Sequence, residues 1–203
     1  MWRAGGIGIG FGVGWNIAVL GPIATRLSHV YGVSLAVVGA FVTVQFVMHM
    51  VMQIPGGRAA DRWGARSSAL LGLALVAAGN AISLPAASPA LAFLGRAVVG
   101  VGTGFAFVGG SDYIRMRGGG ALLQGMYGGG SVLAPGIAVV VVPALASTSL
   151  GWRAAYASAI AVCLACAVLL LLSPPSARTV GHADERLDWG FFRDRRLYRL
   201  AAV

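Results

Sequence analysis

The sequence predicts an all-α polytopic membrane protein with six transmembrane helices. Of its 203 residues, 58% are hydrophobic and 10% are charged, which is far from the composition of a soluble globular domain. Its apolar runs reach the roughly 20 residues that a helix needs to cross a bilayer core of about 30 Å. Transmembrane barrels consist of shorter segments of alternating polarity, so the long runs favour helices.

The six spans follow one another along the chain. They are expected near residues 7–25, 34–55, 68–84, 91–113, 120–146 and 153–173. The first span lacks a small-residue cleavage site after a short apolar core, which indicates a retained helix rather than a signal peptide. Turn-forming residues at 28–32, 85–89 and 147–151 predict three short outer turns.

The chain changes character after the sixth span. Residues 1–173 form the predicted transmembrane domain, and residues 174–203 read as a cytoplasmic linker that begins with Pro174 and Pro175. Apolar character resumes only near Leu200, which looks like the threshold of a missing seventh helix. We therefore expect a truncated or partial protein.

Arginine placement predicts the topology. Only Arg26 and Arg153 flank the side with the outer turns. The side with both chain ends carries the other arginines outside the spans: Arg3, Arg58, Arg62, Arg66, Arg115, Arg117, Arg178, Arg186, Arg193, Arg195, Arg196 and Arg199. By the positive-inside rule we expect a multi-pass protein of the inner (plasma) membrane with both ends cytoplasmic. This topology accounts for the net charge of +9, so no nucleic-acid partner is expected.

An arginine-rich segment lies between the second and third spans. Residues 57–66 read GRAADRWGAR. Gly57 and Gly64 permit a tight turn, Asp61 can accept charge-assisted hydrogen bonds, and Arg62 and Arg66 can pair with carboxylates or helix C-termini. The form G-x-x-x-D-R-x-G-x-R resembles the loop after the second helix of the major facilitator superfamily (MFS). The resemblance implies a cytoplasmic conformational latch in which Arg62 pairs with Asp112, whereas Asp112 on its own also fits a solvated helix end.

Further motifs carry the same resemblance. Arg96, Gly100 and Gly102 match the R-x-x-x-G-x-G pattern of the fourth helix in that superfamily, and Gly21-Pro22 and the segment 151–156 match helix-end patterns. The resemblance implies the N-terminal six-helix half of a secondary transporter. Such a protein binds a small solute between two halves and moves it by alternating access. The implied partners are the lipid bilayer, the solute, protons and a second six-helix half.

Four polar residues inside the spans are candidates for coupling or substrate contact. A buried arginine normally faces a cavity or a partner, so Arg96 is either functional or a side chain that snorkels to the outer surface. Gln45 and His49 share one face of the second span, and His49 could titrate near neutral pH or simply form a packing hydrogen bond. Asn16 in the first span is equally open, as is Asn80 in the third.

Glycines in the fourth and fifth spans predict close helix packing. Gly100, Gly102 and Gly130 would let neighbouring backbones approach, and Pro135 would kink the fifth span. Residues 130–136 partly resemble the G-x-x-x-G-P pattern of drug/proton antiporters, but Ala134 stands in place of a glycine. The antiporter subclass therefore stays open.

The remaining motifs exclude several activities. Cys163 and Cys166 form C-x-x-C inside an apolar run without further ligands, which predicts packing residues rather than a metal or redox site. The sequence holds no P-loop, so ATP-driven transport is not expected. We expect no enzyme activity and no cofactor. Two classes of function remain: a solute transporter, or a non-transporting six-helix membrane module that is inert or assembles with a partner half.

Overall fold

The computed structural model describes residues 1–175, and in this range it consists of helices joined by short loops. The elements are α1 (Trp2–Ala18), η1 (Gly21–Ile23), α2 (Ala24–Tyr31), α3 (Leu35–Trp63), α4 (Ala65–Ile82), α5 (Pro89–Met116), α6 (Ala121–Ala146), η2 (Gly151–Arg153) and α7 (Ala154–Leu171). Six helical segments are long and apolar enough to cross a membrane, with α1 to α2 counted as one. The predicted fold class and number of spans are confirmed. The predicted linker lies outside the described residues from position 176 onward.

Serine caps and glycine breaks set several helix boundaries. The Ser34 side chain accepts from the Val37 amide, and the Ser88 side chain accepts from the Leu91 amide, so α3 and α5 each begin with a capped first turn. Gly64 has φ 92°, a left-handed value that favours glycine, and it separates α3 from α4.

The predicted turn at residues 57–66 is wrong in most of its length. α3 continues through Pro55 and Gly57 to Trp63, so only Gly64 leaves the helix. One glycine costs a helix only about 1 kcal/mol. This end of α3 also gains packing, because Gly56 lies directly on the backbone of Phe105 in α5.

The first outer turn also differs from the prediction. Residues 24–31 are helical, and the chain turns only at Gly32, whose φ is 64°. The span is broken earlier instead, between Ala18 and Ala24, where Pro22 lies in the short helix η1. Proline has no backbone N–H and cannot continue the hydrogen-bond ladder, which explains the break.

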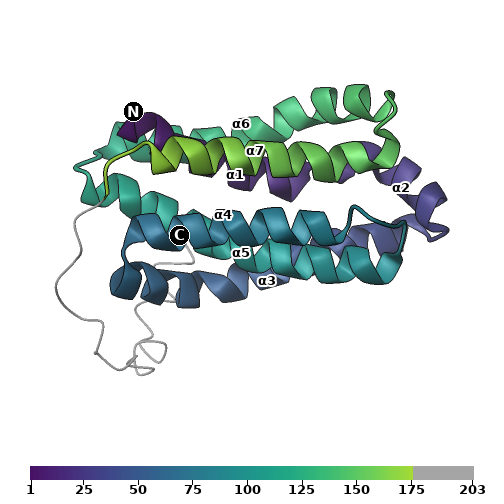
Figure 1. Cartoon of the computed structure of the whole chain (residues 1–203), viewed down its shortest axis with the longest axis horizontal. Coiled ribbons are helices and arrows are strands. Elements are labelled where there is room, and N and C mark those ends of the chain that lie inside the picture. Colours follow the sequence, from purple (N-terminus) through teal and green to yellow (C-terminus); the bar gives the residue numbers. More distant parts are fainter. Residues whose placement is uncertain (176–203) are drawn as a thin grey trace, which may run out of the picture.

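The helices form two layers along a common direction (Figure 1). One layer contains α1, α6 and α7, and the other contains α3, α4 and α5. Two hydrophobic clusters fill the interior. One gathers around Trp15, Phe41 and Tyr156 toward the end of the bundle where α1 ends, and the other around Leu73 and Tyr113 toward the end where α1 begins.

Glycines let α4 and α5 touch backbone to backbone. A Cβ added at Gly102 would lie 2.6 Å from the Gly72 carbonyl oxygen, and one added at Gly79 would lie 2.6 Å from that of Gly95. A Cβ at Gly100 would collide with the Gln45 carbonyl of α3. The backbones of these helices therefore approach one another closely at Gly100 and Gly102.

The contact between α1 and α6 depends on Gly14. Pro135 lies inside α6 and lacks the N–H that would bind the Ser131 carbonyl one turn earlier. Gly14 packs so closely on that carbonyl that any Cβ would collide with it. Gly130 also faces α1, but a Cβ there would lie 3.6 Å from the Ile7 oxygen, an ordinary contact. Gly14, which the motifs did not indicate, is thus the tighter packing position.

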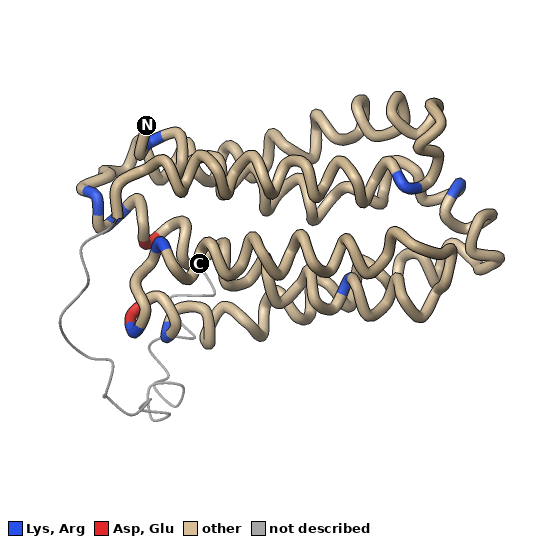
Figure 2. The backbone as a smooth tube through the Cα atoms, in the orientation of Figure 1, with Lys and Arg blue, Asp and Glu red and all other residues tan. Residues whose placement is uncertain are grey.

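The charged residues gather at the ends of the helices (Figure 2). Asp61 lies in the last turns of α3 and Asp112 near the end of α5, at the end of the bundle where α1 begins. Arg26 and Arg153 lie at the opposite end, in α2 and η2. Arg96 is the exception, because it lies within α5 and is fully buried.

Candidate functional site: a buried polar cluster

Arg96 lies deep inside the bundle. It is the eighth residue of α5, about 10 Å from the N-terminal end of that helix at 1.5 Å per residue. Its side chain is 0% exposed although only one six-helix unit surrounds it. The snorkelling alternative is therefore wrong, and Arg96 does not lie on a surface that a second half would cover.

Neutral oxygen atoms from three other helices hold the Arg96 guanidinium. Nη1 donates to the Gln45 side-chain oxygen of α3 at 3.1 Å and to the Asn16 backbone oxygen of α1 at 3.4 Å. Nη2 donates to the Asn80 side-chain oxygen of α4. Nε is buried without an acceptor among the described residues. A buried cation is thus bound without a carboxylate in this part of the chain.

The amide side chains around Arg96 also bind one another. Asn80 Nδ2 donates to the Asn16 side-chain oxygen at 2.8 Å, and Gln45 Nε2 donates to the Asn16 backbone oxygen at 3.0 Å. Asn16 Nδ2 donates to the Cys163 sulfur of α7 at 3.2 Å. Each amide therefore has a donor and an acceptor role that fixes its orientation. We call Arg96, Asn16, Gln45 and Asn80 the polar cluster.

The position of the break after α1 explains why the cation is tolerated. α1 ends at Ala18, so the Asn16 carbonyl lies in its last turn, where carbonyls lack a following helical N–H. A helix C-terminus carries roughly half a negative charge. Arg96 and Gln45 cap this end, which gives the guanidinium a partial counter-charge in place of a carboxylate.

Two tyrosines adjoin the cluster on the side of α2. The Arg96 guanidinium carbon lies 5.4 Å from the ring centroid of Tyr156 in α7, a cation–π distance. The Tyr156 hydroxyl is 2.9 Å from that of Tyr31 in α2. A chain of contacts therefore runs from the cluster to the segment beyond the break.

His49 lies one helical turn from Gln45 on α3 and is nearly buried. Its Nδ1 is 3.1 Å from the Thr103 hydroxyl of α5, which itself donates to the Gly100 carbonyl at 3.0 Å. If Thr103 donates to that carbonyl, its oxygen can accept from His49 Nδ1–H. The imidazole is thus oriented by a defined partner.

The residues of the predicted latch do not form one network. The Asp112 carboxylate binds Arg115 at 2.9 Å, and no ion pair joins it to Arg62 within residues 1–175. Arg66 caps α7 instead, through the carbonyls of Leu170 at 3.2 Å and Leu171 at 2.6 Å. Asp61 and Arg62 are exposed, and a role of this segment as a conformational latch stays a prediction.

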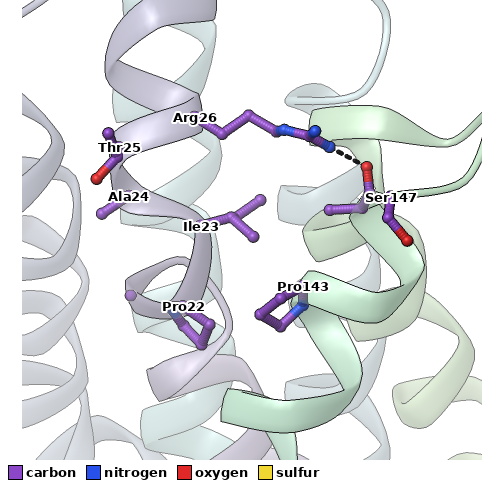
Figure 3. A pocket seen from close by; sticks show the side chains of 9 residues that line it. Pro22, Ile23, Ala24, Thr25, Arg26, Pro143 and Ser147 are labelled. Atoms are coloured by element: carbon purple, nitrogen blue, oxygen red, sulfur yellow. Dashed lines mark hydrogen bonds between the residues drawn. The ribbon is translucent and has the colours of Figure 1, made fainter.

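A separate cavity of about 330 Å³ lies between η1, the start of α2 and the last turn of α6. Pro22 of η1 and Pro143 of α6 line it from opposite sides, and Arg26 extends over it toward the end of α6 (Figure 3). Arg26 Nη1 donates to the Ala146 carbonyl, one of the last in that helix. None of the predicted site residues lines this cavity. We therefore assign Arg26 the role of capping the C-terminal end of α6.

The structure brings most of the candidate coupling residues together. Arg96 binds both Gln45 and Asn16 directly. His49 lies one helical turn from Gln45 and binds Thr103 instead. Sequence reasoning missed Thr103 and Tyr156 as partners. Thr103 follows Arg96 by seven residues and thus shares its helix face, a signal that could have identified it. Nothing in the local sequence links Tyr156 to Arg96.

Comparison with known proteins identifies the family to which the sequence is similar. A family model described as Major Facilitator Superfamily matches residues 7–203. No curated protein matches the chain.

Several solved structures share the fold. The proton:xylose symporter XylE bound to 6-bromo-6-deoxy-D-glucose aligns with a TM-score of 0.69 and 19% identity over 86% of this chain and 44% of that one. The inward-open xylose transporter XylE from E. coli aligns with a TM-score of 0.68 and 19% identity over 86% of this chain and 48% of that one. A D-xylose-proton symporter aligns with a TM-score of 0.70 and 19% identity over 98% of this chain and 52% of that one. The chain spans about half the length of these transporters, and at this identity the likeness shows a common fold.

Proposed function

Because the chain belongs to the Major Facilitator Superfamily, we propose that it forms the N-terminal half of a secondary active transporter that moves a small solute by alternating access. The polar cluster carries this proposal. Buried ionisable groups in membrane helices are costly and mark functional positions, and the cluster joins helices of both layers. A second six-helix half supplies the other wall of the solute pathway.

The surfaces of α3 and α6 suit such a partner. Both helices expose large apolar side chains, including Phe46 and Met50 on α3 and Val132 and Val140 on α6. A Cβ added at any of several α6 glycines would meet nothing within 4 Å: Gly125, Gly128, Gly129 and Gly136. Small residues with free space beside them let another helix approach closely. This open face supports assembly with a second half.

Protons are the proposed coupling ion, and His49 is the proposed carrier in this half. Asp61 and Asp112 lie near helix ends, so neither can serve at the depth of the cluster. Arg96 keeps its proton under nearly all conditions. His49 is the side chain at this depth whose ordinary charge change falls near neutral pH, and Thr103 holds its imidazole.

Solute-driven proton movement tests the proposal. We expect the full chain in proteoliposomes, alone or with a second six-helix half of this family, to take up protons when a solute is added from a panel that starts with D-xylose. His49→Gln keeps a hydrogen-bonding group toward Thr103, so it should leave solute exchange intact and remove the proton signal. The measurement is the fluorescence of a trapped pH dye beside uptake of radiolabelled solute. Absence of flux in every combination would favour the alternative of a non-transporting membrane module.

Site-directed labelling tests the proposed topology, in which both chain ends are cytoplasmic. Ser67→Cys and Ala87→Cys place single thiols at exposed positions at opposite ends of the bundle, in a background with Cys163→Ser and Cys166→Ser. We expect an impermeant maleimide added to intact cells to label position 87 and to reach position 67 only after the membrane is opened. The reverse labelling pattern would indicate the opposite orientation of the protein in the membrane. Labelling of both positions from outside would contradict the proposed six-span topology.

A further inference from the structure

A tryptophan and two arginines from different helices meet at the end of the bundle where α1 begins. Trp2 lies in the first turn of α1, and Arg117 follows the last turn of α5. The guanidinium carbons of Arg3 and Arg117 each lie 5.7 Å from the Trp2 ring centroid. The half-buried ring therefore gathers two positive charges around it.

These charges lack a matching carboxylate in the described part of the chain. Arg117 Nη1 donates to the Pro175 carbonyl at 3.3 Å, and its Nε is buried without an acceptor there. The nearby Asp112 is bound to Arg115. The remaining sequence does not offset the excess, because residues 176–203 contain more arginines than acidic residues.

The adjoining backbone also favours an anion. α6 begins at Ala121 after Gly120, with no side-chain cap. Leu123 N–H donates to the Gly120 carbonyl at 3.1 Å, whereas the N–H groups of Ala121 and Leu122 at the start of this 26-residue helix have no helical acceptor. Gly118 has φ 74°, and neither Gly118 nor Gly120 would have any atom within 4 Å of an added Cβ. An anionic group can thus approach the helix start without meeting side chains of the loop.

We propose that Trp2, Arg3 and Arg117 form a docking site for the phosphate headgroup of an anionic phospholipid. Guanidinium groups bind phosphate oxygens through paired hydrogen bonds. Tryptophan prefers the membrane–water interface, where its ring lies at headgroup level. The ring belongs to the first turn of a transmembrane helix, so the site lies where lipid phosphates lie, which favours a lipid over a soluble anion.

Lipid retention by the full chain tests this site. Native mass spectrometry of the protein from mixed micelles would compare phosphatidylglycerol with phosphatidylcholine of the same acyl chains. We expect wild type to retain phosphatidylglycerol preferentially. Each basic residue near the surface contributes about fivefold to such binding, so the pair Arg3→Gln and Arg117→Gln should weaken retention by roughly 10-fold or more.

A control pair of substitutions distinguishes a specific lipid site from a general effect of surface charge. Arg58→Gln with Arg62→Gln removes the same charge from the same end of the bundle but leaves Trp2 and its arginines in place, so retention should stay within about twofold of wild type. The pair Arg3→Lys and Arg117→Lys, which keeps the charge, should give intermediate retention. Size-exclusion profiles and circular dichroism would confirm that each variant is folded.

Three outcomes would overturn the proposal. The first is equal retention of the two lipids by wild type. The second is equal weakening by both glutamine pairs, which would indicate the general surface charge. The third is displacement of the lipid by millimolar inorganic phosphate at constant ionic strength, which would indicate a site for a soluble anion.

Discussion

Arg96→Ala is expected to abolish transport and to destabilise the bundle by about 3 kcal/mol or more. The change removes the donors that satisfy the Gln45 and Asn80 side-chain oxygens and part of those that satisfy the Asn16 carbonyl. Each buried acceptor left without a donor costs roughly 1–3 kcal/mol. The cavity left by a fully buried side chain adds to this loss.

Arg96→Lys is expected to recover only part of both losses. Lysine keeps the positive charge at the end of α1, which preserves the interaction with the helix dipole. Its single ammonium cannot reproduce the planar fork by which Arg96 reaches Gln45 with one nitrogen and Asn80 with the other. The link between α3 and α4 should therefore weaken even though the charge remains.

Thermal unfolding in detergent and solute uptake in proteoliposomes measure the two effects separately. Arg153→Lys is the matched control, because Arg153 is exposed and donates to the loop carbonyls of Leu84 at 3.0 Å and Pro85 at 3.4 Å. It should stay close to wild type in both measurements. Wild-type uptake by Arg96→Ala would show that the polar cluster is structural and would remove it from the transport mechanism.

The fold was more predictable than the ends of its helices. Hydropathy alone identifies six spans, because each must supply about 20 apolar residues. The second span was predicted to end at residue 55, because the glycines that follow were taken to indicate a turn. Packing on α5 outweighs that local preference and carries the helix to Trp63. Tertiary contact of this kind leaves no local signal.

The candidate site was predicted in its members but not in its connections. Intramembrane polarity identified Asn16, Gln45 and Arg96, since such residues need partners. Their meeting point depends on the break after Ala18, which exposes the Asn16 carbonyl to the guanidinium. Helix breaks at Gly-Pro are readable from sequence. Which side chain then caps the broken end depends on the relative rotation of four helices, and one sequence does not specify that rotation.

The second large effect on stability is expected at Gly14, where α1 makes its closest contact with α6. Gly14→Ala is expected to destabilise the protein by about 1–3 kcal/mol, the typical cost of overpacking. The added methyl group would collide with the Ser131 carbonyl, a backbone atom of α6 that cannot rotate away. Pro135 lacks the N–H that would bind this carbonyl one turn later, so the carbonyl has no helical donor at the point where α1 approaches it.

Gly130→Ala is the matched control, since it adds the same methyl group to the same pair of helices. Its Cβ would lie 3.6 Å from the Ile7 oxygen and 3.7 Å from Ile7 Cγ2, so it fits without displacement. Alanine also has the higher helix propensity, by about 1 kcal/mol. We therefore expect Gly130→Ala to be neutral or stabilising, while Gly14→Ala lowers the unfolding temperature and the folded fraction on size exclusion. Equal behaviour of the two variants would contradict the assignment of Gly14 as the close contact between α1 and α6, because only the position of the methyl group differs between them.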